Sequence, residues 1–146
     1  MTYCPIQPYS DELMTWNEVD EMYYLTEEAL IKRGIPLRSR LALSKASSPE
    51  YIINGLLETV SEMIYNYIHD FSANNKAQDC LIATVPSLRK IIYKALIQQA
   101  VYVLKVGNLS LSVEDSIRSK SIDMNAVRTL NTVVHELGIP ITYTGV

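Results

Sequence analysis

Apolar residues recur every three or four positions in two long stretches of the chain, a spacing that places them on one face of an α-helix. The first stretch begins near Pro49, where Ser47 can cap the helix and Glu50 can close a capping box. The second runs from about Pro86 to Lys105. Both are predicted to be long amphipathic helices. The recurring positions are Ile53, Leu57, Val60, Ile64, Tyr67 and Phe71 in the first stretch and Leu88, Ile92, Ala95, Gln99, Tyr102 and Val106 in the second.

Two further helices are predicted on either side of this pair. The earlier one covers residues 16–33, with acidic residues early, basic residues late and Gly34 as a C-cap. The later one starts at a cap formed by Ser121 or Asp123 and stops at Gly138. Their apolar faces consist of Val19, Tyr23, Thr26 and Leu30 in the earlier helix and of Met124, Val127, Leu130, Val134 and Leu137 in the later one.

The segments between these helices are predicted to be loops, with one exception. Residues 35–48 are basic and broken by Pro36, and residues 72–85 form a long polar break. Residues 108–113, NLSLSV, alternate strictly, which predicts a short strand or hairpin before the last helix. The expected fold class is all-α: a four-helix bundle-like domain over residues 16–138, an N-terminal arm over 1–15 and an extended C-terminal tail over 139–146.

The last nine residues, GIPITYTGV, differ from the helical part of the chain. They carry no charge and alternate apolar with hydroxyl side chains, whereas exposed chain ends are usually polar. A lone extended segment of this kind has no ladder partner of its own. We therefore expect the tail to add as a strand to an edge of another subunit, where main-chain hydrogen bonds supply the pairing.

Charge is mild overall but arranged in blocks. The chain has 13 Lys and Arg against 16 Asp and Glu, which argues against a protein whose main role is to coat nucleic acid. Residues 11–28 hold seven acids and no base, and residues 89–105 hold four bases and no acid. Such blocks are either solvated faces that pair within a monomer or complementary edges between identical subunits, as a heterologous ring requires.

The chain offers little that would support catalysis. It has no P-loop, no G-x-G-x-x-G, no G-x-S-x-G and no metal-ligand spacing around its histidines, His69 and His135. His69 is expected on the solvated side of its helix, and His135 near a helix end. Cys4 and Cys80 are expected to be free thiols, with a disulfide or a metal site as the alternatives. We expect no enzyme activity and no cofactor.

Two further features bear on location and assembly. The most apolar stretch, ALIQQAVYVLKV, is too short to span a bilayer, and the beginning of the chain lacks the pattern of a secretion signal. A soluble protein made inside the cell is therefore expected, without a membrane partner. Tyrosine outnumbers phenylalanine ten to one, and tyrosine suits protein interfaces better than a sealed core. This ratio favours an oligomer.

The second half of the chain resembles the head-tail connector proteins of tailed bacteriophages, also called adaptor or head-completion proteins. The matching pieces follow in order: ALIQQAVYVLKVGN with Gln99, Tyr102 and Gly107, then a serine-rich loop, then SIDMNAVRTLNTVVHELGIPITYTGV. The tail ends, as in that family, in tyrosine, one residue, glycine and an aliphatic residue. The resemblance covers about the last 50 residues closely and the earlier part in helical layout.

The resemblance implies a structural virion protein at the neck, made in the cytoplasm of a bacterial host. Such proteins form a ring, usually dodecameric, between the portal protein and the next tail or neck protein, and extend the DNA channel. The C-terminal tail would dock on the portal through Ile139, Ile141, Tyr143, Gly145 and Val146. Basic residues that could face a neighbouring subunit, or passing DNA in a non-specific contact, are Arg89, Lys90, Lys94, Arg118 and Lys120. The alternative is a small helical phage-encoded module that binds or regulates a host or phage protein.

Overall fold

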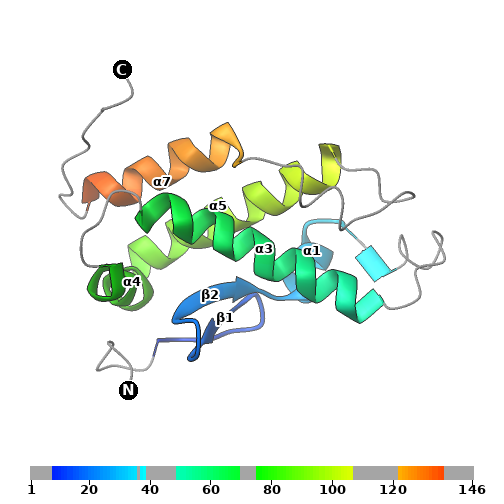
Figure 1. Cartoon of the computed structure of the whole chain (residues 1–146), viewed down its shortest axis with the longest axis horizontal. Helices are drawn as coiled ribbons and strands as arrows, with labels where there is room; N and C mark the ends of the chain where they lie inside the picture. Colours follow the sequence, from blue (N-terminus) through cyan, green and yellow to red (C-terminus); the bar gives the residue numbers. More distant parts are fainter. Residues whose placement is uncertain (1–7, 36, 39–48, 70–74, 107–121, 137–146) are drawn as a thin grey trace.

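The fold was determined as a computed structural model, which describes residues 8–35, 37–38, 49–69, 75–106 and 122–136. Within these residues the chain is mostly helical, as predicted, with five helices and one two-stranded antiparallel hairpin (Figure 1). The elements are β1 (Met14–Asn17), β2 (Met22–Leu25), α1 (Glu27–Lys32), α3 (Pro49–His69), α4 (Asn75–Thr84), α5 (Pro86–Val106) and α7 (Met124–Glu136).

The two long helices, α3 and α5, pack against each other and cross in the middle of the molecule (Figure 1). α7 lies along α5 on one side of this pair, and the hairpin packs mainly against α3 on the other side. α4 is seen nearly end-on, next to the start of α5. One hydrophobic core therefore runs from the hairpin through α3 and α5 to α7.

Local patterns predicted α3, α5 and α7, and the structure confirms them. Apolar side chains recur on the buried face of each, and α3 and α7 begin where the capping signals placed them. α5 contributes the largest share of the core because it contacts α3, α4, α7 and the hairpin. Its fully or almost fully buried residues are Leu88, Ile92, Ala95, Leu96, Ile97, Gln99, Ala100, Val103 and Leu104.

The predicted helix over residues 16–33 was wrong in its first part, where the chain forms the hairpin. The turn between the strands is closed by Asn17, whose Oδ1 accepts the N–H groups of Val19 and Asp20 at 2.9 and 2.8 Å. Glu21 follows with a φ of 54°, a value incompatible with a continuing right-handed helix. The strands pair with Trp16 opposite Tyr23. The hairpin thus lies near the N-terminus and not before the last helix.

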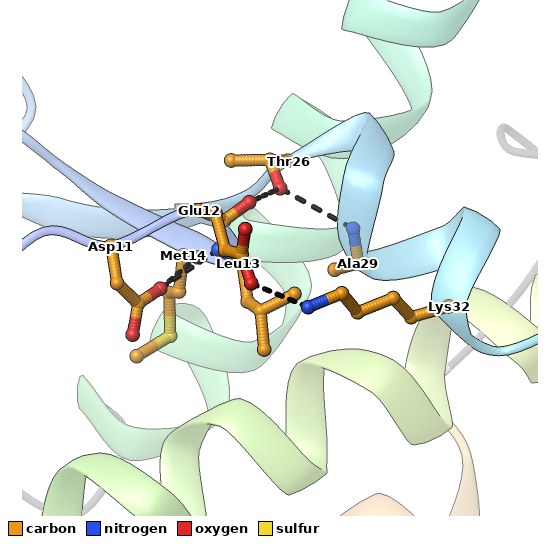
Figure 2. Close-up of polar contacts among 7 residues, drawn as sticks. All are labelled: Asp11, Glu12, Leu13, Met14, Thr26, Ala29 and Lys32. Atoms are coloured by element: carbon orange, nitrogen blue, oxygen red, sulfur yellow. Dashed lines mark hydrogen bonds and ion pairs between the residues drawn. The ribbon is translucent and has the colours of Figure 1, made fainter.

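α1 forms in the second part of the range 16–33, and hydrogen bonds define both of its ends. Thr26 caps it by accepting the N–H of Ala29 and also donates to the carbonyl of Glu12, while Lys32 pairs with the Glu12 carboxylate (Figure 2). The contacts of Thr26 and Lys32 with Glu12 attach the segment before β1 to α1. At the other end Gly34 has a φ of 79°, as predicted for a glycine C-cap.

The end of α1 forms a Schellman motif. The N–H of Gly34 donates to the carbonyl of Ile31 at 2.9 Å, and the N–H of Ile35 donates to the carbonyl of Leu30 at 3.0 Å. These are the two bonds that define the motif, and they satisfy carbonyls that the helix leaves open. The left-handed glycine therefore ends the helix and turns the chain toward Ile35.

The polar break predicted over residues 72–85 was wrong for most of its length. Residues 75–84 form α4, which a single residue, Val85, connects to α5. Its sequence is polar overall, but Ile82 and Ala83 are fully buried against the core. Burial of this one side was enough to form a helix that propensity alone did not indicate.

Other predictions fall partly or wholly outside the described residues. The strand at 108–113 and the tail at 139–146 lie outside them, and the arm at 1–15 is described only from Pro8 onward. The prediction of two free thiols was wrong, because Cys80 is disulfide-bonded. The other cysteine, Cys4, lies outside the described residues.

Candidate interaction surfaces

The outward face of α3 carries acidic and amide side chains. Asn54, Glu58, Glu62 and Asn66 follow one another at intervals of four residues, and all four are exposed. Residues that far apart on a helix lie on the same side. No lysine or arginine occurs anywhere in Pro49–His69. This face of the helix is therefore negative along its central turns.

A groove of about 450 Å³ runs between this face and the hairpin. Both elements contribute side chains to it because β2 packs directly on α3. Most of its lining is polar, and three of its residues are acidic. The lining residues are Thr15, Asn17, Asp20, Tyr24, Leu25, Thr26, Glu27, Arg38, Ile53, Asn54, Leu57 and Glu58.

The acidic side chains around the groove affect the pKa of Tyr24. Partial burial, a hydrogen bond from its hydroxyl to Asp20 and the negative charges of Glu58 and Glu62 all raise the pKa of Tyr24 well above its ordinary value. Each effect opposes formation of a phenolate. A negative potential therefore extends from the hairpin turn to the middle of α3.

One base, Arg38, belongs to the lining, and it is already engaged. Its guanidinium pairs with Glu27 and with Glu50, each at 2.8 Å. The hydrogen bond from Arg38 also lowers the pKa of Glu50. In the part of the chain that the structure describes, the Glu58 carboxylate has no hydrogen bond or ion pair. The negative charge of Glu58 in the groove is thus not balanced by any base in the described part of the chain.

The outward face of α5 has the opposite sign. Ser87, Lys90 and Lys94 are exposed and occupy one side of its first half. Among the described residues neither ammonium group forms an ion pair. Pro86–Val106 contains no aspartate or glutamate. The solvent-exposed side of the first half of α5 is therefore positive.

Arg89 was grouped with Lys90 and Lys94 in the sequence prediction, but the structure separates it from them. Its guanidinium lies 5.0 Å from the ring centre of Tyr9, a cation–π distance. It also lies close to Tyr23. Burial raises the pKa of Tyr23, and the nearby Arg89 acts in the opposite direction. Arg89 attaches the N-terminal segment to α5, whereas the two lysines face solvent.

The remaining predicted residues cannot be located in the same way. Arg118, Lys120 and the tail residues lie outside the described part of the chain. The sequence did show the charge blocks, but it did not show that α3 and the hairpin form a groove, because the hairpin itself had been predicted as helix. The available signal was the β-favouring pair Tyr23 and Tyr24, which follows the turn-favouring residue Asn17.

His69 has a partner that the sequence did not reveal. Its Nε2 lies 2.9 and 3.0 Å from the two carboxylate oxygens of Asp79, which is almost completely buried. The pair joins the end of α3 to α4, and the ring of Tyr65 packs edge-on to the imidazole. The prediction of a solvated histidine was based on its position on the polar side of the helix and did not include α4, which brings Asp79 to the imidazole. The geometry assigns His69 a structural role.

A second cavity, of about 550 Å³, lies where the chain after α1 meets α5 and the start of α7. It combines apolar side chains such as Ile35 and Val101 with polar ones such as Arg33, Gln98 and Asp123. Among the described residues no group of three or more His, Cys, Asp and Glu side chains could hold a metal ion. None of the described helices is long and apolar enough to cross a membrane.

Comparison with known proteins identifies no relative. Neither protein-family models, nor curated proteins, nor solved structures give a match to this chain.

Proposed function

We propose that this chain is a structural connector of a tailed-bacteriophage virion, forming a ring between the portal and the next tail or neck protein. One observation carries the proposal. The two long helices that pack against each other present opposite charges on their outward faces, with Glu58 and Glu62 on α3 and Lys90 and Lys94 on α5. One copy therefore offers two different, complementary surfaces.

Two different complementary surfaces are what a closed ring requires. A head-to-tail interface joins one surface of a subunit to the other surface of the next, and the array closes when the rotation per subunit fits. α3 and α5 share one core, and each leaves a different, oppositely charged side exposed. Opposite charge then aligns the copies and disfavours pairing of like faces.

The order of elements in the second half of the chain also supports the proposal. α5, a serine-rich segment, α7 and an uncharged alternating tail follow one another as in the head-tail connector family that this chain resembles. In the proposed assembly the ring is dodecameric and located at the virion neck. The tail residues Ile139, Ile141 and Tyr143 add a strand to the portal.

The proposed role of the ring is positional and does not involve catalysis. It extends the DNA channel below the portal and completes the head. The formal net charge of −3 per copy fits this role, because a lumen rich in lysine would retain DNA through counterion release. Contact with the passing DNA is then non-specific.

The decisive experiment mixes the purified chain with the portal protein of the same virus and images the mixture by negative-stain electron microscopy. We expect the chain alone to be monomeric or weakly associated. In the mixture we expect it to form a ring stacked on the portal. Absence of binding under all conditions tested would overturn the proposal.

Removal of residues 139–146 tests the role assigned to the tail. We expect the helical circular-dichroism signal to persist while portal attachment is lost. Tyr143→Ala should weaken attachment, whereas Thr142→Ala, on the alternate side of the extended tail, should leave it nearly unchanged. Global unfolding of the truncated chain would instead make the tail part of the folding core.

The rival function is a small helical module that binds a host or phage protein. Exposed apolar side chains favour it, in particular Val19 at the hairpin turn and Tyr51 near the start of α3. Such a module would remain a monomer or dimer in the presence of the portal. Its partner binding would also be insensitive to loss of the tail.

A further inference from the structure

We infer that the groove between α3 and the hairpin is the receptor for the lysine-bearing face of α5 in a second copy of this chain. The inference rests on the proposed ring and names the surfaces that would close it. Glu58, which lines the groove, and Glu62, one helical turn further along α3, receive Lys90 and Lys94 of the next copy.

The first observation is a match in spacing. Glu58 and Glu62 are four residues apart on α3, and Lys90 and Lys94 are four residues apart on α5. Four residues advance a helix by about 6 Å, so both pairs present their charges at the same interval. Two ion pairs can therefore form at once when α5 of one copy lies along α3 of another.

The second observation is that all four charges are available. Their side chains form no hydrogen bond or ion pair with any other residue that the structure describes. Other charges close to the groove are engaged, since Arg38 holds Glu27 and Glu50. A second copy would thus meet two free carboxylates beside a base that is already occupied.

The third observation is the chemistry around the charges. Asn54 and Asn66 flank the glutamates on α3, and Ser87 precedes the lysines on α5. Tyr51 lies on the same stripe, seven residues before Glu58, and is 68% exposed. Polar groups that can exchange hydrogen bonds, together with an exposed tyrosine, are typical of a subunit interface.

The charge of the groove also determines which kind of partner it can take. The carboxylates of Asp20 and Glu58, which line the groove, would repel the phosphates of nucleic acid. A helix with exposed lysines and no acid fits the groove, and α5 of this chain is such a helix. We therefore assign the groove to a second copy of the chain.

The test uses two charge-reversed variants of the full chain. Glu58→Lys with Glu62→Lys makes both surfaces positive, and Lys90→Glu with Lys94→Glu makes both negative. We expect ring assembly on the portal to weaken at least about tenfold for each variant alone, because like charges then face each other across every interface. Circular dichroism checks that each variant is folded.

Mixing the two variants provides the sharper result. In an equimolar mixture every positive surface can meet a negative one if the two variants alternate around the ring. We expect assembly to recover to within about threefold of the wild type, since the charges are exchanged and not removed. The fourfold variant that carries all the reversals in one chain should recover likewise.

A control variant reverses two exposed charges outside both surfaces, Glu28 on α1 and Arg128 on α7. We expect Glu28→Lys with Arg128→Glu to assemble like the wild type. If a charge-reversed variant does not fold, a neutral variant replaces it. The neutral variants are Glu58→Gln with Glu62→Gln and Lys90→Gln with Lys94→Gln. The neutral variants should lose most of the salt dependence of wild-type assembly.

The outcomes separate this inference from the proposed function. Rings that form on the portal with unchanged affinity in the reversed variants would overturn the assignment of the groove and leave the connector function standing. Failure of the mixture to recover, with both variants folded, would also overturn it. If the wild type never associates with itself or with the portal, both proposals fail.

Discussion

The hairpin and α7 attach to opposite sides of the α3–α5 pair, and they do so by different means. The hairpin is held by hydrogen bonds between buried side chains and its own backbone. Ser61 Oγ donates to the carbonyl of Tyr23 at 2.7 Å, and the N–H of Tyr23 donates to the hydroxyl of Tyr65 at 3.2 Å. Both α3 side chains are fully buried.

α7 is held mainly by apolar packing. Ala126, Leu130 and Val133 are fully buried against α5 and α3. Hydrogen bonds also join this side to the pair: the N–H of Asp123, directly before α7, donates to Oε1 of the fully buried Gln99 at 2.7 Å, and the half-buried Tyr67 donates to Asn131 at 2.7 Å. The hairpin therefore depends on buried hydrogen bonds to its own strand backbone beside its apolar contacts, whereas α7 has such a bond at its start and is attached along its length mainly by apolar packing.

The loss of stability should be greatest where apolar packing is the main attachment. Leu130→Ala should lower the free energy of unfolding by about 2–5 kcal/mol, because it opens a cavity under α7. Urea denaturation monitored by circular dichroism measures this loss. Thr132→Ala, at an exposed position of the same helix, should change stability by less than about 0.5 kcal/mol. Equal losses for both variants would contradict a packing-based attachment.

An intermediate effect is expected at the hairpin. Tyr65→Phe removes the acceptor of the Tyr23 N–H and should cost about 1–3 kcal/mol, because a buried donor is left without a partner. Tyr67→Phe removes a similar hydroxyl on the α7 side. Water can reach the amide of Asn131 that remains, so the free energy of unfolding should fall by only about 0.5–1.5 kcal/mol. Urea midpoints for the two variants compare the sides directly. A reversed order would refute the distinction between them.

A more gradual effect is expected at alkaline pH. Burial raises the pKa of Tyr65 and of Tyr23 above the ordinary value of 10.0, so above that pH the folded chain binds more protons than the unfolded one. The stability from the neutral hydroxyls is complete below about pH 10 and is lost as pH rises further, by up to about 1.4 kcal/mol per pH unit for a fully buried tyrosine.

Urea midpoints between pH 8 and pH 11 measure this loss. The decline should be shallower in Tyr65→Phe, which lacks one of the titrating groups, and unchanged in the exposed control Thr132→Ala. A decline of equal slope in Tyr65→Phe would show that Tyr65 contributes nothing to it.

The candidate surfaces could be predicted only in part. The charge blocks and the basic residues Lys90 and Lys94 were visible in the sequence because charge is a property of single residues. The separate role of Arg89 was not visible, since it depends on Tyr9, which is far away in sequence and reaches α5 through the fold. The groove was likewise invisible, because it exists only where the hairpin meets α3.

Local sequence patterns were sufficient to specify the helices α3, α5 and α7 and the end of α1 at Gly34. Their signals are apolar residues every three or four positions, capping residues, proline in a first turn and glycine after the last. The hairpin and α4 depend instead on tertiary contacts. Each is short and buries few side chains, and each is stabilised by partners in other elements, Ser61 and Tyr65 for the hairpin and His69 for α4. Contacts of that kind leave no periodic trace in the segment that depends on them.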